Sequence, residues 1–98
     1  MNITVSKEDS AMTVALEGRL DTTTSPSLES ELKEKLGDTQ DLTFDFEKLE
    51  YISSAGLRVL LSTQKKMNKQ GTMVIVNAND DIKDVFDVTG FSDILTIE

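Results

Sequence analysis

The chain has 98 residues, of which 38% are hydrophobic and 29% charged, and its net charge is -8 at pH 7. It contains no cysteine and no histidine, which excludes disulfides, thiolate nucleophiles, the usual zinc ligands and the commonest general base. The negative charge argues against nucleic acid as a partner, because such binding depends on Lys and Arg side chains neutralising phosphates. The length favours a single domain over residues 1–98.

The sequence offers no segment that would enter a membrane. No apolar run approaches the roughly 20 residues that a spanning helix needs. The first ten residues, MNITVSKEDS, lack the basic region and apolar stretch of a secretory signal. We therefore expect no membrane insertion and a cytoplasmic location.

The first third of the chain predicts a β-hairpin and a helix. Apolar residues alternate with polar ones over residues 2–6 and 12–18, which is typical of two strands, and the KEDSA linker between them suits a hairpin. Ser25 can then cap a helix whose first position is Pro26 and which ends at Gly37. The apolar face of this helix repeats every four residues, at Leu28, Leu32 and Leu36.

The middle of the chain repeats the alternation of strand and helix. Residues 42–46, LTFDF, have period two and predict a strand. A helix follows from Ala55 to Gly71, with an apolar face at Leu57, Leu60, Leu61 and Met67. The lysines near its end, Lys65, Lys66 and Lys69, complement the negative end of the helix dipole.

The last third predicts a strand, a helix and a closing strand. Residues 73–76, MVIV, are apolar without alternation, so we expect a central strand covered on both faces. Asn79 or Asp80 can cap a helix that stops near Gly90, and residues 94–97 predict the closing strand. Strands that alternate with helices after a hairpin indicate an α/β fold with a mixed, mostly parallel β-sheet and packed α-helices.

Few residues in this chain could carry catalysis or hold a ligand. ISSAG is only superficially like the elbow of serine hydrolases, because Ile52 replaces its first glycine and the chain has no histidine base. The aspartates between residues 80 and 87 belong to one helix, no calcium-loop spacing occurs, and the glycines do not form a phosphate cradle. We therefore expect no catalytic residue, no metal and no cofactor.

Ser53 and Ser54 stand between a strand and a helix, and two interpretations fit them. In the first, a serine caps the helix and Gly56 lets the helix approach the sheet closely. In the second, one serine is a phosphoacceptor. A phosphoserine carries a charge of about -1.5 to -2, which the exposed amides at a helix start tolerate while a docked partner does not.

Two separated segments give the chain a resemblance to a known family. GRLDTTTSPSLESEL, residues 18–32, is similar to a G-x-L-D segment before a first helix, and LTFDFEKLEYISSAGLRVLL, residues 42–61, is similar to a strand, turn and D-S-[ST/A]-G-L signature. In this order they resemble the STAS domain, specifically the bacterial anti-sigma-factor antagonists of the sporulation and general-stress type. The tail DIKDVFDVTGFSDILTI also looks like the last helix and strand of that family.

The resemblance implies a regulator that is not an enzyme. Such a protein binds an anti-sigma factor, often itself a serine kinase, and so releases a sigma factor. The kinase phosphorylates the antagonist on the motif serine, which aligns with Ser54, and a serine phosphatase reverses this. The implied partner-binding residues are Asp21, Thr22, Ser53, Ser54, Gly56 and Arg58.

Three alternatives stay open at this point. The family usually has aspartate where this chain has Ser53, which leaves the choice of acceptor and the recognition by the kinase open. Arg58, four residues after Ser54, either approaches a phosphate on Ser54 or contacts the partner directly. A STAS subunit of a membrane transport complex that docks on an ABC-type ATPase is the alternative function, and nucleotide binding at the carboxyl ends of the strands is a weaker third class.

Overall fold

The protein is built on a four-stranded sheet. A computed structural model describes residues 1–98, and its strands are β1 (Asn2–Glu8), β2 (Ala11–Leu20), β3 (Asp41–Ile52) and β4 (Thr72–Val76), in the spatial order β1-β2-β3-β4. β1 and β2 form the antiparallel hairpin, while β2–β3 and β3–β4 are parallel. The predicted α/β class with its mixed, mostly parallel sheet is confirmed.

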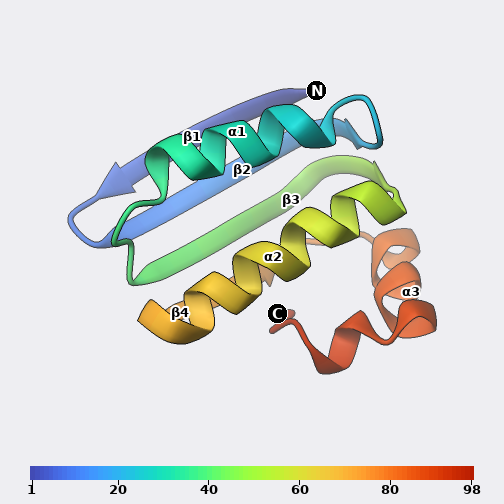
Figure 1. Cartoon of the computed structure of the whole chain (residues 1–98). Helices are drawn as coiled ribbons and strands as arrows, with labels where there is room; N and C mark the ends of the chain where they lie inside the picture. Colours follow the sequence, from blue (N-terminus) through green and yellow to red (C-terminus); the bar gives the residue numbers. More distant parts are fainter.

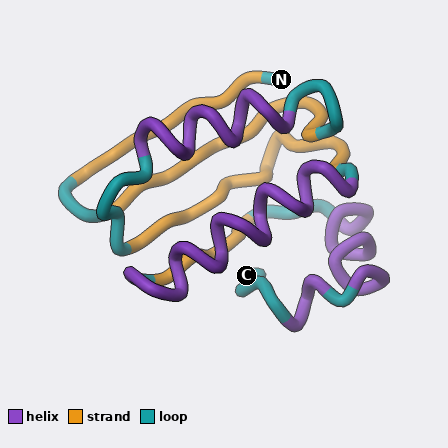
Figure 2. The backbone as a smooth tube through the Cα atoms, viewed as in Figure 1, coloured by secondary structure: helices purple, strands orange, loops and turns teal.

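The helices are α1 (Ser25–Lys35), α2 (Ser54–Gln70) and α3 (Asp80–Thr89), followed by the short 3-10 helix η1 (Phe91–Asp93). α1 and α2 run side by side across one face of the sheet (Figure 1). α3 stands at the end of the sheet where β3 finishes (Figure 2), and the Asn79 side chain ties its start to the Leu49 carbonyl. The fold therefore has two layers, and the opposite face of the sheet carries no helix.

The core lies between the sheet and α1 and α2, as the two periodicities require. The inward positions of β2 and β3 include Val14, Leu16, Phe44 and Phe46, none of which exposes more than 1% of its surface. α1 and α2 contribute the buried residues Leu28, Leu32, Leu57, Leu60 and Met67, and the buried Leu36 follows at the C-cap of α1. The apolar residues that alternate along the strands pack against the apolar residues that repeat every four positions on the helices, and together they form the core.

The C-terminal strand predicted over residues 94–97 is wrong, and so is the central position of β4. The amides of Ile94 and Leu95 both donate to the Phe91 carbonyl, so the chain turns after α3 and keeps only one parallel bridge, Ile75 to Ile97. β4 is consequently the last strand of the sheet. Its MVIV pattern reflects burial of Met73 and Ile75 and partial burial of the two valines.

The helix cap predicted at Ser25 is also wrong. Ser25 is the first residue of α1, is buried, and donates its hydroxyl to the Asp21 carbonyl. The residue at the cap position, Thr24, makes no capping hydrogen bond with its side chain. Instead, the carboxylate of Asp21 accepts hydrogen bonds from the turn that leads into α1, so the capping group stands earlier in the chain.

Candidate functional site

The sheet brings the two sequence motifs together. β2 and β3 are parallel and pair as far as Leu20 opposite Ile52, so the residues that follow them emerge at the same edge. The amide of Ser53 donates to the Leu20 carbonyl at 2.9 Å, which joins the two loops directly. The candidate site therefore consists of the turn before α1 and the start of α2.

The two serines have different surroundings. Ser53 has extended backbone angles at the N-cap of α2, is partly buried, and accepts a hydrogen bond from the amide of Gly56 at 3.4 Å. Ser54 is the first residue of α2, is exposed, and its hydroxyl makes no hydrogen bond within the chain. Ser53 thus caps the helix start, whereas the hydroxyl of Ser54 is exposed and has no hydrogen-bond partner in the chain.

Gly56 fixes how closely α2 approaches the strands. It is buried, and a Cβ atom at this position would lie 2.8 Å from the Leu20 side chain and 2.9 Å from that of Ile52. Both distances are too short for any real Cβ contact, so the close approach expected from the sequence is confirmed. Gly56 lies beneath the surface and positions Ser54.

The carboxylate of Asp21 organises the turn before α1. Its Oδ1 accepts hydrogen bonds from the amides of Thr23 at 3.0 Å and Thr24 at 3.1 Å, and Arg19 Nε lies 3.8 Å from Oδ2. The Thr24 amide, more than any other group, holds the pKa of Asp21 below its ordinary value, with the Thr24 hydroxyl, the Thr23 amide and the Arg19 charge acting in the same direction. Asp21 is therefore a negative charge fixed in the loop beside α2.

Sequence reasoning missed one feature of this edge, the pair of Arg19 and Tyr51. These residues are partners across β2 and β3, and the guanidinium carbon of Arg19 lies 4.1 Å from the centroid of the Tyr51 ring. Tyr51 is 41% exposed, which is unusual for a side chain of this size. The pairing of the two motif strands could have suggested the contact, but two irregularities in the register between β2 and β3 obscure it.

Thr22 and Arg58 come together at the mouth of a hollow between α1 and α2. Both are exposed and line a space of about 380 Å³, together with Ser25, Pro26 and Ala55 among others. Arg58 makes no ion pair, and the first turn of α2 contains no acidic residue. Five of the six predicted partner-binding residues thus keep at least part of their surface exposed around the start of α2, and the sixth, Gly56, is buried.

The structure contains no cluster of three or more acidic side chains that could hold a metal ion. None of its helices combines the length and the apolar character needed to cross a membrane.

Comparison with known proteins agrees with this geometry. The family model of the STAS domain matches residues 2–98. This chain belongs to the STAS domain family. Its relatives include BtrV of Bordetella bronchiseptica, 31% identical over 99% of this chain and 85% of BtrV, and the anti-sigma-B factor antagonist of Staphylococcus aureus, 30% identical over 99% of this chain and 92% of the relative.

Solved STAS structures share the fold. An anti-sigma factor antagonist from Mycobacterium paratuberculosis superposes with a TM-score of 0.88 at 24% identity, covering 98% of this chain and 83% of that one. SpoIIAA in its unphosphorylated form gives a TM-score of 0.78 at 15% identity, covering 99% of this chain and 87% of SpoIIAA. Bacillus SpoIIAA has also been solved in a phosphorylated form, so one protein of this fold carries phosphate.

Proposed function

We propose that this STAS protein is an anti-sigma-factor antagonist of the cytoplasm, a regulator without catalytic activity of its own. In its unphosphorylated form it binds an anti-sigma factor of the serine kinase type and frees a sigma factor. The kinase phosphorylates Ser54 and ends the binding, and a serine phosphatase restores it. The exposed hydroxyl of Ser54 at the first position of α2 carries the proposal, together with relatives named as anti-sigma-B factor antagonists.

The surroundings of Ser54 explain how the fold could tolerate a phosphate. The first amides of a helix have no acceptor within the helix and lie at the positive end of its dipole, so an anion there is stabilised. The first turn of α2 has no acidic residue that would repel the phosphate, and the Asp21 carboxylate in the neighbouring loop is held by the amides of Thr23 and Thr24. The domain therefore stays folded while its partner surface changes by about -1.5 to -2 charges.

The choice between the two serines follows from their hydrogen bonds. The Ser53 hydroxyl accepts from the Gly56 amide and is partly buried, so its modification would disturb the cap of α2. Ser54 has neither constraint. In this chain Ser53, which stands where the family usually has aspartate, caps α2, and we assign the acceptor role to Ser54.

The partner surface in this proposal surrounds Ser54. Asp21, Thr22 and Arg58 present a carboxylate, a hydroxyl and a guanidinium beside it, while Ser53 and the buried Gly56 hold the loop in place. Away from this surface, the overall net charge of -8 favours a partner that is positive overall, because complementary long-range potentials accelerate association.

Arg58 has two possible roles within this proposal. It follows Ser54 by one helical turn and makes no ion pair, so it is free either to contact the phosphate or to contact the partner. The melting temperatures of phosphorylated and unphosphorylated protein separate these roles. If phosphorylation changes the melting temperature by the same amount in wild type and in Arg58→Ala, then Arg58 contacts the partner and not the phosphate.

Phosphorylation is tested with the cognate kinase, identified by affinity capture, and ATP. Intact mass and peptide mapping should show one added phosphate on Ser54 in wild type and in Ser53→Ala, and none in Ser54→Ala. Phosphate on Ser53, phosphate outside both serines, or no phosphate at all would contradict the proposal. Capture of an ABC-type ATPase instead of a kinase would favour a subunit of a transport complex.

A further inference from the structure

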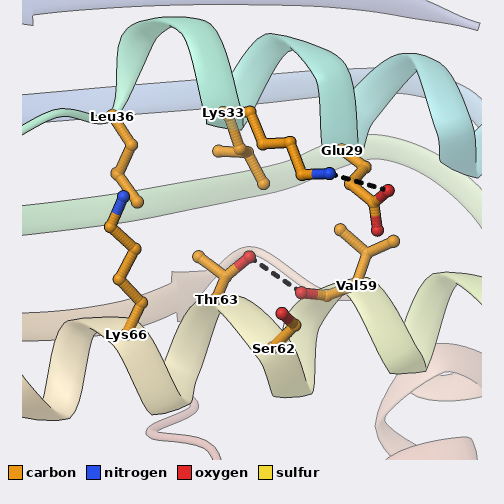
Figure 3. A pocket seen from close by; sticks show the side chains of 8 residues that line it. Glu29, Lys33, Leu36, Val59, Ser62, Thr63 and Lys66 are labelled. Atoms are coloured by element: carbon orange, nitrogen blue, oxygen red, sulfur yellow. Dashed lines mark hydrogen bonds and ion pairs between the residues drawn. The ribbon is translucent and has the colours of Figure 1, made fainter.

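A second hollow continues the first along the space between α1 and α2. The two share Glu29, Val59 and Ser62, so together they form one groove that starts beside Ser54 and runs toward the C-terminal ends of both helices. The far part has a volume of about 290 Å³. Figure 3 shows its apolar floor, which includes Leu36 and Val59, and its polar rim.

The groove is cationic although the molecule is acidic. α2 contains four basic residues and no acidic one, in a chain whose net charge is -8. On the α1 side, Lys33 pairs with Glu29 at 3.7 Å, which neutralises the one carboxylate of the groove. Arg58 and Lys66 make no ion pair, and the Lys66 side chain reaches across the groove toward Leu36 (Figure 3). The groove therefore presents two unpaired positive charges, one toward each end.

The walls of the groove determine which kind of chain fits it. Both walls are helices, whose backbone groups are already hydrogen-bonded, and the Thr63 hydroxyl already donates a hydrogen bond to the Val59 carbonyl. An extended peptide would find no backbone partners there. A segment that satisfies its own backbone, which means a helix, can place apolar side chains over Leu32, Leu36 and Val59, which are core residues that each expose 7% of their surface or less.

We infer that the groove between α1 and α2 is a docking site for an acidic amphipathic helix of a protein partner. Apolar residues one turn apart on that helix pack on the floor, and its carboxylates pair with Lys66 and Arg58. The groove begins at Ala55 and Arg58, next to Ser54, so a phosphate on Ser54 adds a like charge near the end where the acidic helix enters and weakens its binding. The identity of the partner as the anti-sigma factor rests on the proposed function, whereas the docking chemistry does not.

The probe is a synthetic helical peptide of about 15 residues with Leu one turn apart on one face and Glu elsewhere. Its matched control has Lys in place of every Glu. Fluorescence anisotropy with the unphosphorylated protein should detect binding of the acidic peptide only. Backbone amide shifts in NMR spectra should change at Val59, Ser62 and Lys66 and should leave the helix-free face of the sheet unchanged.

Three variants localise the binding. Lys66→Glu should lower the affinity for the acidic peptide by about tenfold, because it replaces an attraction with a repulsion inside the groove. Lys65→Glu makes the same charge change on α2 outside the groove lining and should have less than about a third of that effect. Ser62→Trp fills the groove from an exposed position and should abolish binding while the far-ultraviolet spectrum stays the same.

Several results would overturn the inference. Equal binding of the basic peptide, equal losses in Lys65→Glu and Lys66→Glu, or full binding by Ser62→Trp each remove the groove as the site. Sedimentation with anionic vesicles that depends on Lys66, without any binding of the acidic peptide, would assign the groove to a lipid surface. Peptide binding that stays equally tight when Ser54 carries phosphate would keep the docking site and refute the proposed switch.

Discussion

α2 and α3 begin in similar ways but differ in charge. Each follows a parallel strand and starts with a polar side chain that caps an amide three residues on, Ser53 to Gly56 at 3.4 Å and Asn79 to Ile82 at 2.8 Å. The first turn of α3 contains Asp80 and Asp81, whereas the first turn of α2 contains no acidic residue. α3 carries the negative charges that its dipole favours, and α2 leaves that place open at its exposed serine.

This difference gives the two helix starts different electrostatic surroundings. At the start of α3, a short capping hydrogen bond and two aspartates already satisfy the exposed amides and the helix dipole. A longer cap and a first turn without acidic residues leave α2 able to gain stability from an anion, and that anion would alter the surface that we propose for the partner. Experiments that exchange these properties between α2 and α3 test the comparison directly.

The largest effect is expected at Gly56, which has no counterpart in α3. Gly56→Ala should lower the free energy of unfolding by about 1 to 3 kcal/mol, because the new Cβ lies 2.8 Å from the Leu20 side chain and the start of α2 must move. Urea unfolding measures this loss. Ser30→Ala, an exposed change on α1, is the control and should differ from wild type by less than about 0.5 kcal/mol.

The two caps should differ in strength. Asn79→Ala should lower the free energy of unfolding by about 1 to 2 kcal/mol, because the Asn79 side chain accepts from the Ile82 amide at 2.8 Å and also donates to the Leu49 carbonyl. Ser53→Ala should cost about 0.5 kcal/mol, since its hydrogen bond to the Gly56 amide is long. Thermal unfolding of both variants gives the comparison, and a larger loss for Ser53→Ala would contradict it.

A charge at residue 54 should make α2 resemble α3. Ser54→Asp is expected to stabilise the protein by about 0.3 to 1 kcal/mol at low salt, because it places a carboxylate at the positive end of the α2 dipole. Asp80→Ser should destabilise α3 by a similar amount through the same mechanism. Both effects should shrink in high salt, and a destabilising Ser54→Asp would show that the start of α2 does not favour an anion.

The smallest effect is a pH dependence that originates at Asp21. Its pKa is lowered in the folded protein, so this carboxylate contributes stability at pH values above its unfolded value of 3.8 and loses it as the pH falls through the folded value. The difference in melting temperature between wild type and Asp21→Asn should therefore shrink as the pH falls below 3.8. The control is Ser30→Ala, an exposed change that adds or removes no titrating group, and its difference in melting temperature from wild type should stay the same across this pH range.

The periodicities predicted most of the fold, because alternation and four-residue repeats report burial directly. The leucines of α1 and the alternation in Leu42, Phe44 and Phe46 are examples, and all of them are buried. The strand predicted over residues 94–97 failed because its pattern does not reveal that the Phe91 carbonyl accepts two amides and turns the chain. A cap at Ser25 failed because the Asp21 carboxylate competes for the same turn.

From the sequence, the part of the candidate site that could be predicted is the one that follows from the order of strands along the chain. Parallel pairing of β2 and β3 necessarily brings the ends of both motifs to one edge. Which serine is free depends on a single hydrogen bond from Gly56, and the contact of Arg19 with Tyr51 depends on an irregular register. The cationic groove depends on how far apart α1 and α2 lie in space, and the sequence alone gives no information about that distance.

The central claim is that the state of Ser54 controls partner binding, and the affinity for the cognate anti-sigma factor tests it most directly. Isothermal titration with unphosphorylated protein and with protein carrying phosphate on Ser54 should show a loss of at least about tenfold on phosphorylation, with the domain still folded. Equal affinities for the two forms would contradict the account.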